Sequence, residues 1–371
     1  MPIRIQPYTS EFTEPVADFN RRMAPAKIPF QVPETPRASW LPKIDGREIY
    51  QEIFLAIEDG CVRGAYTFKY QEFSLGGRIR SVGACQMPIS EGILDKRYSL
   101  VGPKIVNDAL QREPLSYGLG MGDPNGAIVK MLVAMGWQMR QVPFYFRVRN
   151  ALRFLRNIQH LRNSPAKKLA LDLAAFSGIG WMGVKAAKLA LSPNPRRYES
   201  CWTEQVSEFS GWATDLWREC HPRYAMVGVR DARVLNILYP AEDDRFLRLR
   251  IVDGGRVVGW AVVLDTRMSR NKYFGDMRVG SIIDVLARPE DAHKVIFMAA
   301  QVLERRGVDL LLSNQSHTAW GAALRQAGFL RGPSNYLFLT SVPLSALLRQ
   351  IDPHGAGVHM TRGDGDGPIH L

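Results

Sequence analysis

Short apolar runs separated by turn residues predict an antiparallel meander in each half of the chain. In the first half, the runs between residues 52 and 89 are broken at Asp59-Gly60 and at Gly76-Gly77. In the second half, the runs between residues 246 and 267 turn at Asp253-Gly254-Gly255. Asp-Gly and Gly-Gly pairs favour the positive φ angles that tight hairpin turns require. We therefore expect β-hairpins on both sides of the chain.

Segments outside the hairpins follow helical spacing or form short apolar runs. Apolar residues recur at three- and four-residue spacing in three stretches that we expect to be helices: residues 100–112, 199–220 and 292–307. Runs that we expect to be strands lie at residues 3–8, 115–121, 279–287 and 308–313. Pro103 falls in the first turn of a predicted helix, where its missing N–H is not needed, and Gly307 ends another.

Two stretches of the chain repeat the same order of elements. Residues 122–137 (GDPNGAIVKMLVAMGW) and 314–329 (NQSHTAWGAALRQAGF) each predict a helix that follows a strand and ends at a Gly-aromatic pair. Gly136 and Gly328 are 192 positions apart (328 − 136), and a further apolar run follows each pair. Repetition at a fixed offset indicates duplicated structural units.

The duplicated units predict an α+β protein with two similar domains, each a mixed, mostly antiparallel sheet flanked by helices. A length of 371 residues accommodates two domains. The expected divisions are a first domain at 1–150, a basic helical connector at 151–197, a second domain at 198–345 and a tail rich in Gly, His and Asp at 346–371.

Composition limits the class of protein. Hydrophobic residues make up 46% of the chain and charged residues 23%, so the chain can bury cores and is not of the disordered class. Its four cysteines form no CxxC pair and the first twelve residues contain no apolar signal-peptide core, so we expect a cytoplasmic protein. A net charge of +12 favours an acidic partner: cofactor phosphates, an acidic carrier protein, an anionic membrane face or nucleic acid.

Much of the positive charge lies in the connector. Between residues 149 and 197 many Arg and Lys residues stand against a single acid, Asp172, and surround the apolar stretch 169–191. Three interpretations are open: a transmembrane helix, an amphipathic helix at the inner membrane face, or a helix packed between the two domains. The basic segment would suit an acidic carrier protein or an anionic membrane surface.

The order of elements, closed by Asn125-x6-Leu132-x3-Gly136-Trp137 and its counterpart at Phe329, resembles the GNAT superfamily of acyl-CoA-dependent N-acyltransferases. The resemblance covers residues 45–150 and 200–341, as a tandem copy. Tandem GNAT-like halves also occur in Fem-type aminoacyltransferases and in acyltransferases of bacterial exopolysaccharide clusters. The segments VRDARVLNILYP (229–240) and MTRGDGDGP (360–368) are similar to the exopolysaccharide group.

The resemblance implies a coenzyme A site in the first half. The family motif R/Q-x-x-G-x-G/A binds the pyrophosphate through backbone N–H groups at the start of a helix. Here the matching stretch is RYSLVG, with Leu100 in place of the first glycine. The implied cofactor-binding residues are Met87, Ile89, Arg97, Ser99, Leu100, Val101, Gly102, Lys104 and Asn125. The alternative is a basic helix start without a ligand.

The second half departs from this motif. Its equivalent stretch, Arg288 to His293, has neither glycine, and Glu290 and Asp291 would place negative charge where a pyrophosphate lies. We expect this half to lack a normal cofactor site and to shape an acceptor pocket or support the fold.

The resemblance further implies acyl transfer from a thioester to an amine, which requires a base for the ammonium and an acid for the thiolate. Backbone groups of residues 86–90 and 117–122 would contact the pantetheine arm. The tyrosine that often acts as the acid stands four residues before the Gly-aromatic pair, but this chain has Leu132 and Leu324 there. The usual acid is therefore absent from both halves.

Two carboxylates are candidates for the catalytic base. Glu91 follows the fourth predicted strand and is either a base or a solvated loop residue. Asp284 interrupts the apolar run SIIDVLA and is either a buried structural group or an acceptor-binding one. His317 opens the second repeated helix, where a capping or surface role is favoured over catalysis.

The tail contains His354, His359 and His370 with Asp364 and Asp366. Glycine-rich spacing does not bring such groups together, so no metal site is expected. The tail is expected either to be unstructured or to fold back over a cleft.

The leading hypothesis is an N-acyltransferase that uses acyl-CoA or an acyl carrier protein thioester. Its acceptor would be a small amine, an amino sugar or amino acid derivative, in polysaccharide or cell-envelope biosynthesis. The alternative is a non-catalytic tandem GNAT-like protein that binds a ligand or scaffolds an assembly. No recognised motif supports nucleic-acid binding.

Overall fold

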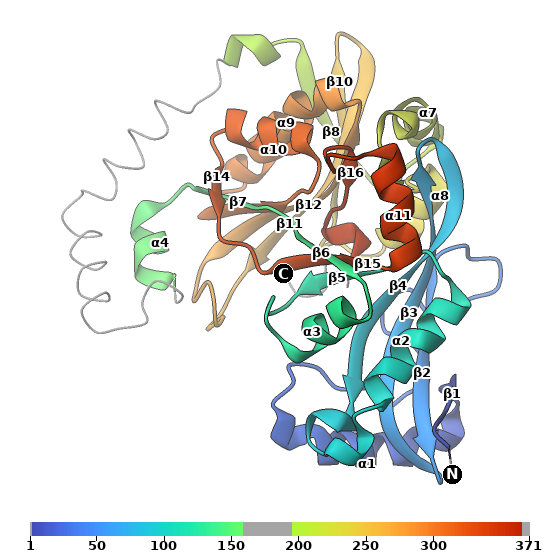
Figure 1. The fold of residues 1–371 in the computed structure, drawn as a ribbon. Coiled ribbons are helices and arrows are strands. Elements are labelled where there is room, and N and C mark those ends of the chain that lie inside the picture. Colours follow the sequence, from blue (N-terminus) through green and yellow to red (C-terminus); the bar gives the residue numbers. More distant parts are fainter. Residues whose placement is uncertain (1, 159–194, 366–371) are drawn as a thin grey trace.

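The computed structural model describes residues 2–158 and 195–365 (Figure 1). The first half contains β1 (Arg4–Pro7), α1 (Thr13–Met23), β2 (Tyr50–Glu58), β3 (Cys61–Leu75), β4 (Arg78–Ser90), α2 (Val101–Arg112), β5 (Ser116–Met121), α3 (Ala127–Ala134), β6 (Gln138–Gln141), β7 (Phe144–Val148) and α4 (Ala151–Asn157). The stretch 169–191, for which a membrane helix or a packed connector was expected, lies outside the described residues.

The second half follows a similar order. It contains β8 (Cys201–Val206), α7 (Gly211–Cys220), β9 (Met226–Gly228), α8 (Ala232–Leu238), β10 (Leu247–Asp253), β11 (Arg256–Arg267), β12 (Arg278–Ala287), α9 (Ala292–Arg305), β13 (Leu310–Asn314), α10 (Thr318–Gln326), β14 (Leu330–Gly332), β15 (Tyr336–Thr340), α11 (Val342–Ile351) and β16 (Val358–His359). Two mixed sheets flanked by helices result, which confirms the α+β expectation.

The strands form two sheets that share members between the halves (Figure 1). Sheet A has the order β1-β2-β3-β4-β5-β15-β6, and β9 extends it along the end of β3, with β16 beside β9. Sheet B has the order β14-β7-β13-β12-β11-β10-β8. The ladders β4–β5 and β12–β13 are parallel, whereas the hairpin ladders are antiparallel.

One strand of each half, β7 and β15, is exchanged. β7 of the first half pairs with β13 and β14 in sheet B, while β15 of the second half pairs with β5 and β6 in sheet A. Phe144 and Phe146 of β7 pack against the second-half core residues Val279 and Leu312. Each sheet therefore contains strands from both sides of the predicted domain boundaries at 150 and 198. These boundaries remain a prediction.

The predicted hairpin turns are confirmed. Asp59-Gly60 joins β2 to β3, Gly76-Gly77 joins β3 to β4, and Gly254-Gly255 joins β10 to β11. Both residues of each pair have positive φ, between 48° and 82°. Two-residue turns of this kind match the right-handed twist of the flanking strands.

The repeated helices end in the same way. Gly136 has φ 87° and Gly328 has φ 79°. The N–H of Trp137 donates to the Leu132 carbonyl, and the N–H of Phe329 donates to the Leu324 carbonyl, at 3.0 Å in both cases. This is the Schellman arrangement, in which glycine allows a left-handed residue and the following aromatic closes the helix end. The repeat found in the sequence is thus a repeat of structure.

One predicted helix is wrong in its first part. Residues 201–206 of the stretch 199–220 form the edge strand β8, which pairs antiparallel with β10, and the helix α7 begins only at Gly211. The helical spacing of Val206, Phe209 and Trp212 was misleading because it spans both elements. Pairing with β10 decided the conformation of the strand, since β propensity depends on tertiary context.

Helices cover both faces of sheet A in the first half. Ile53 and Leu55 of β2 point to the cluster that includes Val16 and Phe19 of α1. The intervening residue Phe54 points to the opposite cluster, with Val101, Ile105 and Ala109 of α2. Alternate side chains of a strand point to opposite faces, so α1 and α2 lie on opposite sides of the sheet.

Candidate functional site

The parallel strands β4 and β5 separate soon after they begin. They pair only at Gly83 with Ser116 and at Ala84 with Tyr117. Beyond these positions, β4 keeps its pairing with β3 and β5 keeps its pairing with β15. The inner backbone edges of residues 85–90 and 118–121 therefore face each other across a widening gap without a ladder between them. Such edges can hydrogen-bond to an extended ligand.

A β-bulge lies in β4 at the start of this gap. Thr67 of β3 pairs with Gln86 and Ala65 pairs with Ile89, so Tyr66 faces two residues, Met87 and Pro88. Met87 has φ 46°, an unusual conformation for a residue other than glycine. Bulges bend a strand and are frequent beside active sites. The bulge includes Met87, one of the predicted cofactor-binding residues, while Ile89 is buried in the core beside α1.

Glu91 follows β4 but is not solvated. It is 8% exposed, accepts a hydrogen bond from Nε of Arg22 at 3.0 Å, and accepts another from Arg63 at 3.1 Å. Both carboxylate oxygens are thus engaged by guanidinium groups of α1 and β3. A role as base would require these ion pairs to open. In the structure they join the loop after β4 to α1 and β3.

The loop from Asp95 to Gly102 exposes most of its predicted ligand groups. The Arg97 side chain is 81% exposed and pairs with Asp95 at 2.6 Å. Ser99 is exposed, and Leu100 is 66% exposed. Lys104 is half-buried in the first turn of α2, and Asn125 is exposed in the loop before α3.

The N-terminus of α2 has free hydrogen-bond donors. No described residue accepts a hydrogen bond from the backbone N–H groups of Leu100, Val101 or Gly102. Val101 is fully buried against the sheet, which fixes the helix in place. A Cβ atom at Gly102 would lie 2.9 Å from Sδ of Met131 in α3, so glycine allows α2 and α3 to approach. Free N–H groups at a helix N-terminus favour a bound anion.

The equivalent gap in the second half contains the C-terminal tail. β12 and β13 pair from Val279 to Ile282, and a bulge at Ile283 precedes Asp284. The tail reaches both separated strand ends: the side chain of His359 hydrogen-bonds to the Val285 carbonyl at 2.9 Å, and Arg362 donates to the Asn314 side chain at 2.9 Å. As far as residue 365, the tail therefore folds back into a cleft, which was one of the two expectations for it.

Asp284 lies in a buried ion-pair network with the tail. Arg230 donates to Asp284 at 2.7 Å and to Asp364 at 2.5 Å, and these side chains are at most 3% exposed. Tyr239 donates to Asp284 at 2.7 Å, and Thr361 does so at 3.0 Å. Burial alone would lower the pKa of Arg230, but the two carboxylates outweigh burial and raise it. The structure thus places Asp284 among structural partners.

The start of α9 holds its own carboxylate. Asp291 is 6% exposed and pairs with Arg288 at 3.1 Å and with Lys294 at 2.8 Å. Glu290 pairs with Arg223 at 3.4 Å. An acidic group beside the helix N-terminus satisfies the electrostatic preference that a phosphate would otherwise satisfy.

A buried polar cluster on sheet A was missed by the sequence reasoning. Lys69 is fully buried, and its Nζ donates to the main-chain oxygens of Asp364 at 2.7 Å and Gly365 at 3.3 Å. Gln86 donates to the Gly365 oxygen at 2.8 Å, and Tyr117 donates to the Asp364 oxygen at 2.6 Å. Burial, and secondly the charge of Asp364, raise the pKa of Tyr117 well above its usual value.

A periodic signal for this cluster exists in the sequence. Thr67, Lys69 and Gln71 alternate with the aromatic residues Tyr66, Phe68 and Tyr70 in β3, and all but Tyr70 are buried. Polar residues at every second position of a buried strand indicate a polar face that another part of the chain must satisfy. The sequence did not indicate that the C-terminal tail would do so.

Three of the four cysteines have thiol groups with raised pKa values. Burial raises the pKa of Cys85 and Cys220 to about 12, and that of Cys201 to about 11. No group of three or more potential ligands in residues 2–158 and 195–365 is placed to hold a metal ion. Within the same ranges, no helix combines the length and apolar character needed to cross a bilayer.

Comparison with known proteins gives structural matches only. The sequence matches no protein-family model, and a search of curated proteins finds no match. A GCN5-related N-acetyltransferase (GNAT) from Anabaena variabilis aligns with a TM-score of 0.53 and 10% identity over 92% of this chain and 73% of that one. A GCN5-related N-acetyltransferase from Kribbella flavida aligns with a TM-score of 0.51 and 11% identity over 91% and 70%.

A third match is Saccharomyces cerevisiae N-myristoyltransferase with bound myristoyl-CoA and inhibitors. It aligns with a TM-score of 0.51 and 10% identity, over 92% of this chain and 80% of that one. These similarities concern the fold. The chain has the fold of the GNAT-type N-acyltransferases, present as two copies in one polypeptide.

Proposed function

We propose that this protein is an N-acyltransferase whose first half binds the acyl thioester donor. The observation that carries the proposal is the difference between the two copies. In the first, the gap between β4 and β5 leads to an α2 N-terminus with unengaged N–H groups at Leu100, Val101 and Gly102. In the second, the tail hydrogen-bonds to both separated strand ends and Asp291 lies at the helix N-terminus, whereas in the first the tail meets the side chains of Gln86 and Tyr117 at the start of the gap.

In this proposal, the N–H groups of α2 bind the pyrophosphate of acyl-CoA, and Arg97 and Lys104 add positive charge. The backbone of residues 86–90 pairs with the pantetheine arm. An acyl carrier protein thioester is the alternative donor, and the basic segment 149–197 would suit its acidic surface. That segment lies largely outside the described residues.

Tyr117 is the proposed acid for the departing thiolate. Leu132 occupies the position of the usual tyrosine, whereas Tyr117 stands at the last paired position of β5, where the gap opens. Its phenol carries a proton at neutral pH, as an acid requires, and would first have to release the Asp364 carbonyl to which it donates. Glu91 and Asp284 remain the proposed carboxylates, and each would first have to leave its arginine partners.

The acceptor in this proposal is a small amine, an amino sugar or amino acid derivative. A role in polysaccharide or cell-envelope biosynthesis rests on the resemblance of residues 229–240 and 360–368 to acyltransferases of exopolysaccharide clusters. In this protein both segments contribute to the Arg230–Asp284–Asp364 network.

The test has a binding part and a turnover part. Coenzyme A should raise the melting temperature, and Leu100→Asp should weaken its apparent affinity about tenfold or more, because a carboxylate would meet the pyrophosphate at the helix N-terminus. Val342→Asp is the matched control, since Val342 is also an exposed apolar residue at a helix start, that of α11. Equal affinities of the two variants would contradict the proposed donor site.

Turnover is measured as release of free thiol from a panel of acyl thioesters and amines. Release that depends on the amine supports the enzyme. Stabilisation by coenzyme A without thiol release favours the second candidate, a non-catalytic ligand-binding protein. The observations favouring that candidate are the leucines at 132 and 324 and the tail in the second cleft.

A further inference from the structure

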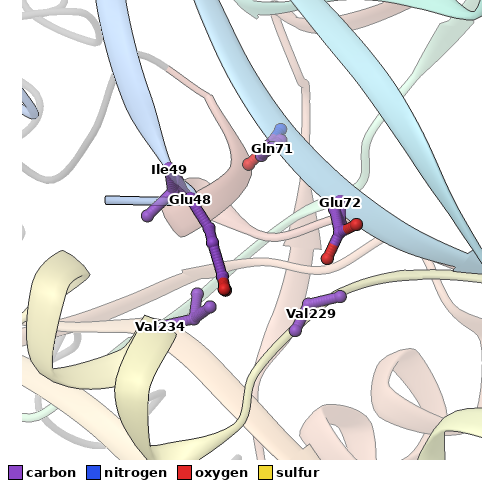
Figure 2. Close-up of a pocket in the computed structure, with 6 residues that line it drawn as sticks. All are labelled: Glu48, Ile49, Gln71, Glu72, Val229 and Val234. Atoms are coloured by element: carbon purple, nitrogen blue, oxygen red, sulfur yellow. The ribbon is translucent and has the colours of Figure 1, made fainter. Parts of the chain in front are cut away.

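A small cleft lies where β3 of the first half meets the segment that leads into α8 of the second. Its lining residues are Glu48, Ile49, Gln71, Glu72, Val229 and Val234 (Figure 2). The backbone at its edge is fixed, because the N–H of Val229 donates to the Glu72 carbonyl at 2.9 Å. The cleft is thus built from both copies of the fold.

The floor of the cleft carries an acceptor that the described residues leave unsatisfied. Gln71 is 4% exposed, and no described residue donates to its Oε1 atom. Its amide orientation is determined by Tyr117, whose hydroxyl donates to the Asp364 carbonyl and therefore accepts from the Gln71 Nε2 atom. Figure 2 shows the amide oxygen turned toward Ile49 and Glu48, with the nitrogen on the far side. A buried amide oxygen without a donor is costly, so a donor is expected from a ligand.

The rim of the cleft is acidic. Glu72 is exposed, and no ion pair or side-chain hydrogen bond joins its carboxylate to the described residues. Glu48 contributes one oxygen to Arg233, at 2.6 Å, and its side chain is 48% exposed. Two carboxylate side chains and one amide side chain therefore line the same cleft, and their oxygens accept hydrogen bonds without donating any.

The walls between these groups are apolar. Ile49, Val234 and Val229 are all buried, Val229 at 8% exposure. An ammonium group supplies three donors and a positive charge, and a short aliphatic stem would cover the apolar walls. A guanidinium fits less well, because its planar donor fork needs a wider set of acceptors.

We infer that the cleft lined by Glu48, Gln71 and Glu72 binds a primary aliphatic ammonium group. The inference deepens the proposed function and rests on it for its biological meaning: the cleft would hold the cationic end of the acceptor. Gln71 is hydrogen-bonded to Tyr117, and Tyr117 pairs with β4 where the gap opens. A ligand in the cleft is therefore connected to the proposed reaction centre through two side chains.

The test measures binding of butylammonium by saturation-transfer NMR titration of the full-length protein, without any donor. Butan-1-ol serves as the neutral probe of similar shape. Glu72→Gln should weaken butylammonium binding about threefold to tenfold, since one partly exposed charge contact is lost. Glu208→Gln is the matched control, because Glu208 is an exposed glutamate with no described partner, outside the cleft.

The expected result is binding of butylammonium that exceeds binding of butan-1-ol, is lowered by Glu72→Gln and is unchanged by Glu208→Gln. Equal binding of the two probes, or equal loss in the two variants, would overturn the inference. Because no thioester is present, a failure of acyl transfer in the turnover assay leaves this result unaffected. The two proposals can therefore fail separately.

Discussion

His317 should make the stability of the protein depend on pH in the mildly acidic range. The residue is 7% exposed and caps α10, where its Nδ1 atom accepts a hydrogen bond from the Ala319 N–H at 3.1 Å. This confirms the capping role favoured by the sequence. Burial, and secondly the neighbouring His359, lower the pKa of His317 from 6.5 to about 3. The folded protein therefore keeps this imidazole neutral.

The sign and size of the effect follow from proton linkage. Below pH 6.5 the unfolded chain takes up a proton at this site, whereas the folded protein does not until about pH 3. The contribution to stability is therefore complete above pH 6.5 and is lost as the pH falls toward 3. The loss from this residue is about 2 kcal/mol at pH 5 and about 4 to 5 kcal/mol at pH 3.

The variant His317→Asn separates titration from capping. Asparagine also accepts a hydrogen bond at the N-cap, so α10 keeps its cap. Loss of the ring contact with Tyr224, whose centroid lies 4.9 Å away, should lower stability equally at every pH. The fall in unfolding free energy between pH 7.5 and pH 5 should then be about 2 kcal/mol smaller in the variant than in the wild type.

Urea unfolding at several pH values, followed by tryptophan fluorescence, measures this difference. His354→Asn is the control, because His354 is exposed in the loop after α11, and its profile should follow the wild type. The reasoning would be refuted if His317→Asn lost as much stability as the wild type between pH 7.5 and pH 5. Such a result would mean that the buried ring is protonated, or that water reaches it.

Three further changes test other parts of the fold. Arg230→Met should lower the unfolding free energy by about 3 to 5 kcal/mol in urea at neutral pH, since two buried carboxylates lose their partner. Asp253→Asn should reduce the fall in unfolding free energy between pH 4 and pH 2 by about 1 kcal/mol. The hydrogen bond from Lys294 lowers the pKa of Asp253 to about 2, and partial exposure reduces the effect. Gly83→Ala should cost about 2 kcal/mol or more in thermal unfolding, because the added methyl group would overlap the Phe68 ring.

The sequence predicted the elements whose signals are local. The turns at Asp59-Gly60 and Gly76-Gly77 require glycine at positive φ, and the helix stops at Gly136 and Gly328 require the same. The strand β8 was assigned to a helix because its pairing with β10, some 45 residues away in sequence, outweighs local spacing. The exchange of β7 and β15 leaves no local signal, since each strand has the apolar sequence of an ordinary strand that follows a repeated helix.

The place of the loop before α2 could be predicted from the sequence, whereas the polar contacts around the candidate site could not. The loop before α2 lies at the start of a helix as the family motif implies, and its exposed Arg97 follows from the polar sequence around it. For Glu91 the sequence left two interpretations, a base or a solvated residue. Its arginine partners could not be found from local sequence, because they lie in α1 and β3, 69 and 28 positions away. Lys69 was not singled out, since the tail that satisfies it lies 295 positions further on.

The strand exchange has a consequence for how the protein is made. During synthesis, the first-half sheet emerges without β15, whose Tyr336–Thr340 must insert between β5 and β6. Until β15 is made, the backbone groups on this edge of β5 have no partner strand. Unpaired strand edges tend to pair with other chains. Completion of the early sheet thus waits until Tyr336–Thr340 has been synthesised, so the two copies must mature together, and a fragment that stops before β15 should be prone to aggregation.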